Sequence, residues 1–120
     1  METTLAALAR DLELAAAEAP VKCAALVAKG ALNIKDEARK NAKASSGTHA
    51  AKYPSTITYG IDAGGLGAEI GPERRGQGNL GPILENGSVH NQPHRDLGRA
   101  LDAEEPRFLA EAAKLAIPWA

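Results

Sequence analysis

The residues of this 120-residue chain that could carry chemistry are few and scattered. Residues 76–81 have the spacing G-x-G-x-x-G of a dinucleotide-binding turn, in which backbone N–H groups cradle a pyrophosphate. Such a turn has to lie between a buried strand and a long helix. Here Pro72-Glu73-Arg74-Arg75 precedes the glycines, and Pro82 with a single predicted helical turn follows them. We therefore interpret the segment as a flexible loop without a nucleotide.

His90 and His94 are four residues apart, a spacing that can chelate a metal ion when both lie on one helix. Pro93 lies between them and disfavours a helix there, and no cysteine is near. The two histidines are therefore expected in an exposed loop, without a metal.

The remaining reactive groups lack partners in the sequence. Cys23 has Lys22 beside it, which can lower a thiol pKa, but no base is evident, so a packing or surface role is expected. The acidic pairs Asp36-Glu37 and Glu104-Glu105 are adjacent, and adjacent side chains on a helix point in different directions. The sequence therefore predicts no enzyme and no cofactor.

Composition points to a small, modestly stable domain. The chain has a formal net charge of −1, so its overall charge does not indicate a nucleic-acid or membrane partner. It has one cysteine, so it cannot form the internal disulfide framework of a secreted scaffold. No apolar run approaches the roughly 18 residues of a membrane helix, and no basic leader opens the chain, so a protein made in a cytosol is expected. One Phe, one Trp and two Tyr leave the core to Ala, Leu, Ile and Val. We expect further burial in an assembly.

Periodicity predicts two N-terminal helices. Leu5, Leu8 and Leu12 form the apolar stripe of a helix over about residues 3–19. Pro20 either ends this helix or begins the next one, where its fixed φ suits a first turn. A second helix is predicted over about residues 21–44. Its apolar stripe comprises Val27, Ala31, Ile34, Ala38 and Ala42.

After the loop at residues 45–48, the apolar residues recur at every second position instead of every third or fourth. Apolar residues alternate on both sides of Asp62-Ala63-Gly64-Gly65, which predicts a β-hairpin over about residues 55–71 whose apolar face packs on the long helix or on a partner. A short helix over residues 82–85 is closed by Asn86-Gly87. A C-terminal amphipathic region follows over about residues 95–117, kinked or restarted at Pro106 and stopped by Pro118. The prediction is one α+β domain, residues 1–120, with a small antiparallel sheet.

Charge is distributed unevenly along the chain. Residues 21–53 hold seven Lys or Arg and two acidic residues, whereas residues 1–20 hold one Arg and four acidic residues. A basic helix over residues 21–44 could face phosphates, which makes a small nucleic-acid-binding protein the alternative function, but no aromatic residues interleave to stack on bases. The asymmetry also suits head-to-tail contact in a ring, with Lys29, Lys35 and Lys40 meeting an acidic helix of the next subunit.

The order of the elements resembles the neck, or tail-completion, proteins of long-tailed bacteriophages, which join the head to the tail. The residues that carry the resemblance are the helix 24–44, the loop Ser45-Ser46-Gly47, the hairpin 55–71, Leu84-Glu85-Asn86-Gly87-Ser88, and Pro93 with the helix from about Leu97. The chain departs from the family before Glu85, where Ile83-Leu84 stand in place of a common aromatic residue.

The resemblance implies a virion subunit, present in the host cytoplasm during assembly, that forms a ring with copies of itself. The ring would lie between head-completion (stopper) proteins and the tail terminator or tube, with genomic DNA passing through the lumen without sequence-specific binding and without a membrane. Gly76-Gln77-Gly78 is expected to order on docking, and Glu85 to be a structural or interface carboxylate or else a solvated helix-end residue. The interface candidates are Lys29, Lys35, Lys40, Arg74, Arg75, Gly76, Gly78 and Glu85.

Overall fold

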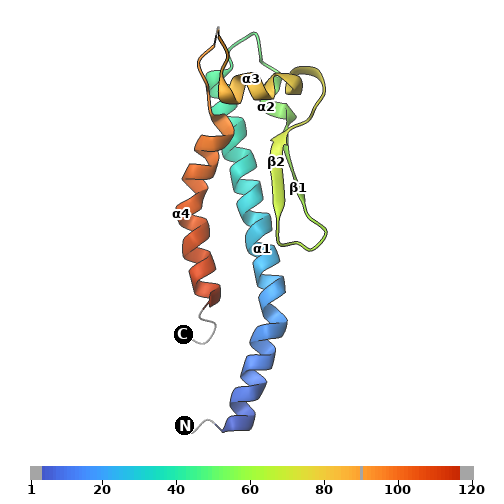
Figure 1. Cartoon of the computed structure of the whole chain (residues 1–120), viewed down its shortest axis with the longest axis vertical. Coiled ribbons are helices and arrows are strands. Elements are labelled where there is room, and N and C mark those ends of the chain that lie inside the picture. Colours follow the sequence, from blue (N-terminus) through green and yellow to red (C-terminus); the bar gives the residue numbers. More distant parts are fainter. Residues whose placement is uncertain (1–3, 90, 117–120) are drawn as a thin grey trace.

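A computed structural model of the chain describes residues 4–89 and 91–116. It confirms the α+β prediction, with a long N-terminal helix, a two-stranded antiparallel sheet and a C-terminal helix (Figure 1). The elements are α1 (Leu5–Ser45), α2 (Tyr53–Thr56), β1 (Ile57–Ile61), β2 (Ala68–Pro72), the 3₁₀ helix η1 (Gly76–Leu80), α3 (Gly81–Asn86) and α4 (Asp96–Ala116).

The N-terminal region is one helix, so the predicted end at Pro20 is wrong. Thr4 caps the start of α1, where its hydroxyl accepts a hydrogen bond from the Ala7 N–H at 3.0 Å. Pro20 has no N–H for the carbonyl of Ala16, and a proline inside a helix costs about 3 kcal/mol. The helix is exposed to solvent here, so water can reach the freed carbonyl, and the alanine-rich flanks favour helix on both sides.

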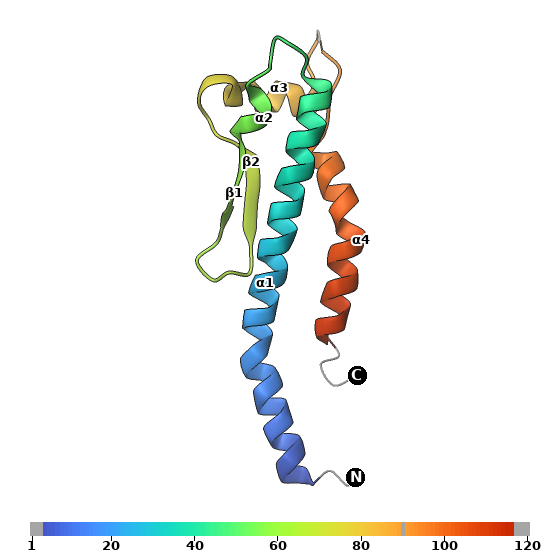
Figure 2. The same ribbon diagram turned by 180° about the vertical axis from the view of Figure 1, so that it is seen from behind.

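The predicted hairpin is confirmed and packs along α1 (Figures 1 and 2). The strands pair from Ile57 with Pro72 to Ile61 with Ala68, and the turn is closed by hydrogen bonds from Asp62 to Gly67 and from Gly65 to Asp62. Ile57 is fully buried and Ile70 packs against the core. The inner face of the hairpin therefore meets the long helix.

The helix α4 runs antiparallel to α1 on the side away from the hairpin (Figure 1). Small residues let the two helices approach closely: a Cβ on Gly30 would lie 3.0 Å from the ring of Phe108. Pro106 lies inside α4 and does not divide it, and the predicted stop at Pro118 lies outside the described residues. The core beside these helices consists of Ala38, Ala42, Ala50, Tyr53, Ile57 and Ala100.

The glycine segment after the hairpin is ordered, which corrects the prediction of a flexible loop. Residues Gly76–Leu80 form η1, and the side chain of Gln77 accepts a hydrogen bond from the Lys52 N–H at 2.7 Å and donates one to the His49 carbonyl. Gly78 is buried, and a Cβ there would overlap the carbonyl of Glu73. Close packing, and not mobility before docking, requires glycine at this position.

The molecule is elongated, measuring 68 × 25 × 20 Å. The first part of α1 projects beyond the hairpin and α4 (Figures 1 and 2); we call residues 5–20 the arm. The apolar side chains of the arm are open to solvent, with Leu5 85% exposed and Leu8 and Leu12 each 46% exposed. The rest of the described chain, which holds the core, is called the body.

Filling the space between the two long helices should destabilise the body. In Gly30→Leu the new side chain would overlap Phe108, so we expect the free energy of unfolding to fall by about 1–3 kcal/mol in urea titrations followed by circular dichroism. Ala28→Leu, at an exposed position on the same helix, should change it by less than about 0.5 kcal/mol. Equal effects of the two substitutions would contradict the packing described here.

Candidate functional site

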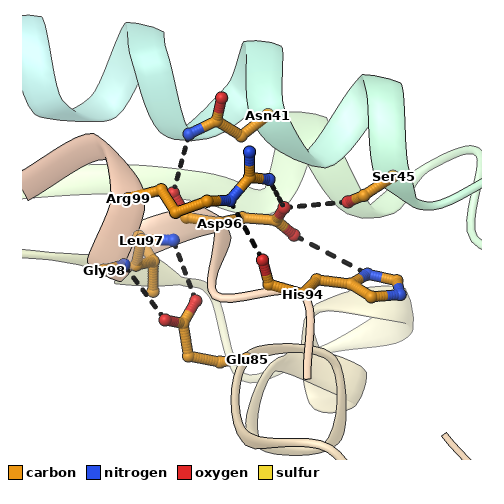
Figure 3. A network of polar contacts seen from close by, with 8 residues as sticks. All are labelled: Asn41, Ser45, Glu85, His94, Asp96, Leu97, Gly98 and Arg99. Carbon is orange, nitrogen blue, oxygen red and sulfur yellow. Dashed lines mark hydrogen bonds and ion pairs between the residues drawn. The ribbon is translucent and has the colours of Figure 1, made fainter. Parts of the chain in front are cut away.

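Polar side chains gather where α3, the start of α4 and the end of α1 meet (Figure 3). We call this cluster the capped junction. It comprises Asn41 and Ser45 of α1, Glu85 of α3, and His94, Asp96 and Arg99 at the start of α4. Its contacts fix where α4 begins and how α4 lies against α1.

Glu85 caps α4 from a different helix. One carboxylate oxygen accepts a hydrogen bond from the Leu97 N–H at 2.8 Å, and the other accepts one from the Gly98 N–H at 3.0 Å. First-turn N–H groups have no partner within their own helix, and the helix dipole favours a negative charge there. Of the alternatives that the sequence left open for Glu85, this geometry corresponds to the structural carboxylate. A Cβ on Gly98 would lie 3.3 Å from the carboxylate and 2.8 Å from Arg95 Nη2, so glycine leaves room for the cap.

The loop before α4 is tied to the end of α3. The N–H of His94 donates to the Leu84 carbonyl at 2.8 Å, and that of Arg95 donates to the Glu85 carbonyl at 3.2 Å. Arg95 has φ = 52°, in the left-handed region that a residue with a side chain rarely adopts. The surrounding hydrogen bonds hold this conformation, which turns the chain so that the first turn of α4 faces Glu85.

Asp96 ties α4 to α1. Its carboxylate is almost fully buried, 1% exposed, and one oxygen accepts hydrogen bonds from the Ser45 hydroxyl at 2.8 Å and from Arg99 Nη2 at 3.1 Å. The Asp96 carbonyl accepts a further hydrogen bond from the Asn41 amide at 3.1 Å. The other carboxylate oxygen lies 3.9 Å from His94 Nδ1. A buried carboxylate is tolerated only with such partners, so the position of α4 against α1 is tightly specified.

A second polar tie lies further along the two helices. The amide of Asn33 donates to the buried carboxylate of Glu104 at 3.2 Å, and Arg107 pairs with the same carboxylate. Glu105 is exposed, so the adjacent acidic residues point in different directions, as predicted.

Tyr53 of α2 is buried beside the capped junction. Burial, and then the nearby negative charges of Asp96 and Glu85, raise the pKa of its phenol to about 12. The neutral phenol is therefore the form that the folded body accommodates.

The interface candidates on α1 differ in their surroundings. Lys29 and Lys40 are exposed, whereas the Lys35 side chain is only 17% exposed, pairs with Asp36 at 3.0 Å and lies over the ring of Tyr59 at 5.7 Å. Lys35 therefore belongs to the packing of the hairpin on α1 and not to the same open face as the other two lysines.

The candidates after the hairpin do not form a single site. Arg74 and Arg75 are exposed, and Arg75 pairs with Glu73 at 3.1 Å. Gly76 is exposed with φ = 56°, whereas Gly78 is buried. Arg74 borders an open groove of about 790 Å³ between the hairpin, η1 and α3, whose polar lining residues come from separate elements.

The polar contacts described above join elements of the fold to one another. No group of three or more His, Cys, Asp or Glu in this part of the chain is placed to hold a metal ion, and His90 of the His90–His94 pair lies outside it. None of the helices over residues 4–89 and 91–116 is long and apolar enough to cross a membrane. Sequence reasoning missed Asn41, Ser45, Tyr53 and Asp96. An Asp just before an apolar periodic run signals a helix start, but nothing in the spacing pairs it with α1.

Removing the cap should destabilise the body. Glu85→Ala leaves the N–H groups of Leu97 and Gly98 without acceptors, so we expect the free energy of unfolding to fall by about 1–3 kcal/mol. The free energy of unfolding of Glu85→Gln should be intermediate between those of Glu85→Ala and the wild type, because an amide can accept a hydrogen bond with only one of its two end atoms. Glu69→Gln on β2, an exposed carboxylate, is the matched control and should match wild type in the same urea titration. A Glu85→Ala chain as stable as wild type would contradict the capping role.

The buried phenol should make stability fall at alkaline pH. A tyrosine whose pKa is about 10 unfolded and about 12 folded stabilises the fold fully below pH 10, and this contribution is lost as pH rises from 10 to 12. Over that range the folding equilibrium constant should drop by up to about tenfold per pH unit. Tyr53→Phe cannot ionise and should lack this drop, whereas the exposed Tyr59→Phe should retain it. Denaturant titrations at pH 9 to 12 measure the difference, and identical pH profiles for Tyr53→Phe and wild type would contradict it.

Comparison with family models, with curated proteins and with solved structures gave no match to this chain. We therefore infer its function from the contacts and exposed faces described above and from the order of its elements.

Proposed function

We propose that this chain is a structural subunit of the neck of a long-tailed bacteriophage. Copies of it form a ring that joins the head-completion proteins to the tail, and the genomic DNA passes through the lumen. The observation that carries the proposal is the arm, a length of helix that projects from the body with leucines open to solvent. The order of helix, hairpin, short helix and final helix, which resembles neck proteins, supports the same assignment.

The exposed leucines favour an assembly over a free monomer. Fully burying a leucine side chain stabilises by about 1.5–3 kcal/mol, and monomeric proteins rarely expose contiguous apolar patches larger than a few hundred Å². Leu5, Leu8 and Leu12 recur on one side of the arm, so they can be covered together by a single partner surface.

The small core favours the same conclusion. The buried apolar residues of the described chain are five alanines with Tyr53 and Ile57, and alanines contribute little burial each. A subunit of this kind gains stability from its neighbours. The capped junction keeps the body in one shape, which a repeated, shape-matched contact requires.

The alternative, a nucleic-acid-binding protein using residues 21–44, has less support. Lys22 pairs with Glu18 at 3.2 Å, Lys35 pairs with Asp36, and Arg39 Nε donates to the Ile57 carbonyl at 2.8 Å. Fewer basic side chains are thus free than the sequence count suggests. DNA affinity of the purified chain that falls steeply with salt would favour this alternative.

Deleting the encoding reading frame from the phage genome should block the joining of heads to tails. Electron micrographs of lysates should show DNA-filled heads and separate tails, and the wild-type chain supplied in trans should restore joined particles. Mass spectrometry of purified particles should find the chain in constant proportion to the other neck proteins. Infectious, fully joined particles that lack the chain would contradict the proposal.

A further inference from the structure

We propose that the arm of one copy packs across an exposed lysine face of α1 in the next copy, so that neighbouring subunits are joined head to tail. The lysine face is defined by Lys29, Lys40 and Lys43. This inference rests on the proposed function, because it names the contact that would build the ring.

The arm carries an uncovered continuation of a packed surface. Its stripe recurs at spacings of three and four residues, which places the members on one side of the helix. The same spacing continues through Cys23 and Leu26 to Gly30, which lies against Phe108 of α4. The exposed stripe of the arm therefore lies on the same side of α1 that packs against α4 in the body. The stripe comprises Leu5, Leu8, Leu12, Ala15 and Ala19.

The charges beside the stripe specify a basic partner. At about 100° per residue, Asp11 and Glu18 lie along one edge of the stripe, whereas Glu13 and Arg10 lie toward the far side of the helix. Glu18 pairs with Lys22 at 3.2 Å, but both side chains are more than half exposed, so this surface ion pair is weak and the edge stays acidic. Two arms packed together would bring these carboxylates near each other, which is unfavourable. The surface that covers the stripe is therefore expected to carry positive charge.

The lysine face has the complementary charge. Lys29 and Lys40 are eleven residues apart, which is about three helical turns, so they share one side of α1, and Lys43 lies about one turn further. All three are exposed, and none pairs with an acidic residue among those described.

Acidic side chains adjoin the face beside Lys40, where Asp36 and Glu37 of α1 and Glu104 of α4 line a shallow hollow. Glu104 pairs with Arg107, so the three lysines exceed the unpaired acidic charge there. Asp36 lies on the same side of α1, but its carboxylate pairs with Lys35 Nζ at 3.0 Å, which offsets its negative charge. Ala25, at the N-terminal end of the face, is exposed and small. A second helix can therefore approach closely there and meet the lysines with its acidic edge.

The lengths also match. Leu5 and Ala19 at the ends of the stripe are fourteen positions apart, and so are Lys29 and Lys43 at the ends of the face, which gives each a length of about 21 Å along the helix. The molecule measures 25 × 20 Å across its short axes, so an arm of this length reaches across a neighbour. Each copy gives one arm and receives one. In a dimer joined by one such heterologous contact, one arm and one lysine face stay uncovered, so the contact can repeat until a ring closes.

A charge-reversal cycle tests the pairing with the full-length chain. Asp11→Lys with Glu18→Lys reverses the acidic edge of the arm, and Lys29→Glu with Lys40→Glu reverses the face. By sedimentation velocity at low salt, each pair of substitutions alone should weaken self-association by at least about tenfold, and combining them should restore it to within about threefold of wild type. Additive losses without restoration overturn the proposal.

Matched variants separate the contact from the fold. Leu12→Ala should weaken self-association at least about tenfold while leaving the thermal unfolding of the body unchanged, because Leu12 lies outside the core. Lys52→Glu reverses an exposed charge outside the lysine face and should leave association unchanged. A wild-type chain that stays monomeric at its highest soluble concentration also overturns the contact. The neck function would still stand, because the deletion phenotype tests it independently.

Discussion

The carboxylate of Glu85 on the first turn of α4 is the interaction on which the rest of the body depends. The hydrogen bonds that the N–H groups of Leu97 and Gly98 donate to Glu85 fix where α4 starts. Glu85 lies on α3, so a helix of only six residues sets the direction of α4. Once α4 starts there, Asp96 faces Ser45 and Asn41, and the alanines of the two long helices come into contact. The body is thus organised by polar contacts at one end, and its small apolar core fills the space that these contacts define.

The two parts of the long helix α1 lie in different environments. Its C-terminal part lies between the hairpin and α4 and carries the alanines of the core, with Arg39 and Lys35 drawn into the hairpin side. Its N-terminal part has the same apolar periodicity but no neighbour among the described residues. One sequence pattern therefore provides both the inside of the subunit and the surface that we assign to its contacts.

Much of the fold could be predicted from local patterns, because hydrophobic periodicity and turn residues act over a few positions. The hairpin, with its turn at Asp62–Gly65, and the amphipathic final helix follow from them. The predictions that failed depended on long-range environment. Pro20 was expected to end a helix, but alanine-rich flanks and access of water to the freed carbonyl let α1 continue. Gly78 resembled a mobile loop residue, yet its glycine is required by contact with Glu73. The partners of Glu85, Asp96 and Lys35 lie in other elements, which spacing alone does not identify.

The unbroken path of α1 from arm to body has a mechanical consequence. No loop intervenes between arm and body, so a rotation of the body carries the arm with it. A slight tilt of the body swings Leu5, near the far end of a helix of 41 residues, through a much larger arc. A subunit seated at the wrong angle would then miss its neighbour altogether. In the proposed ring, the continuous helix would thereby act as a geometric check on each added subunit.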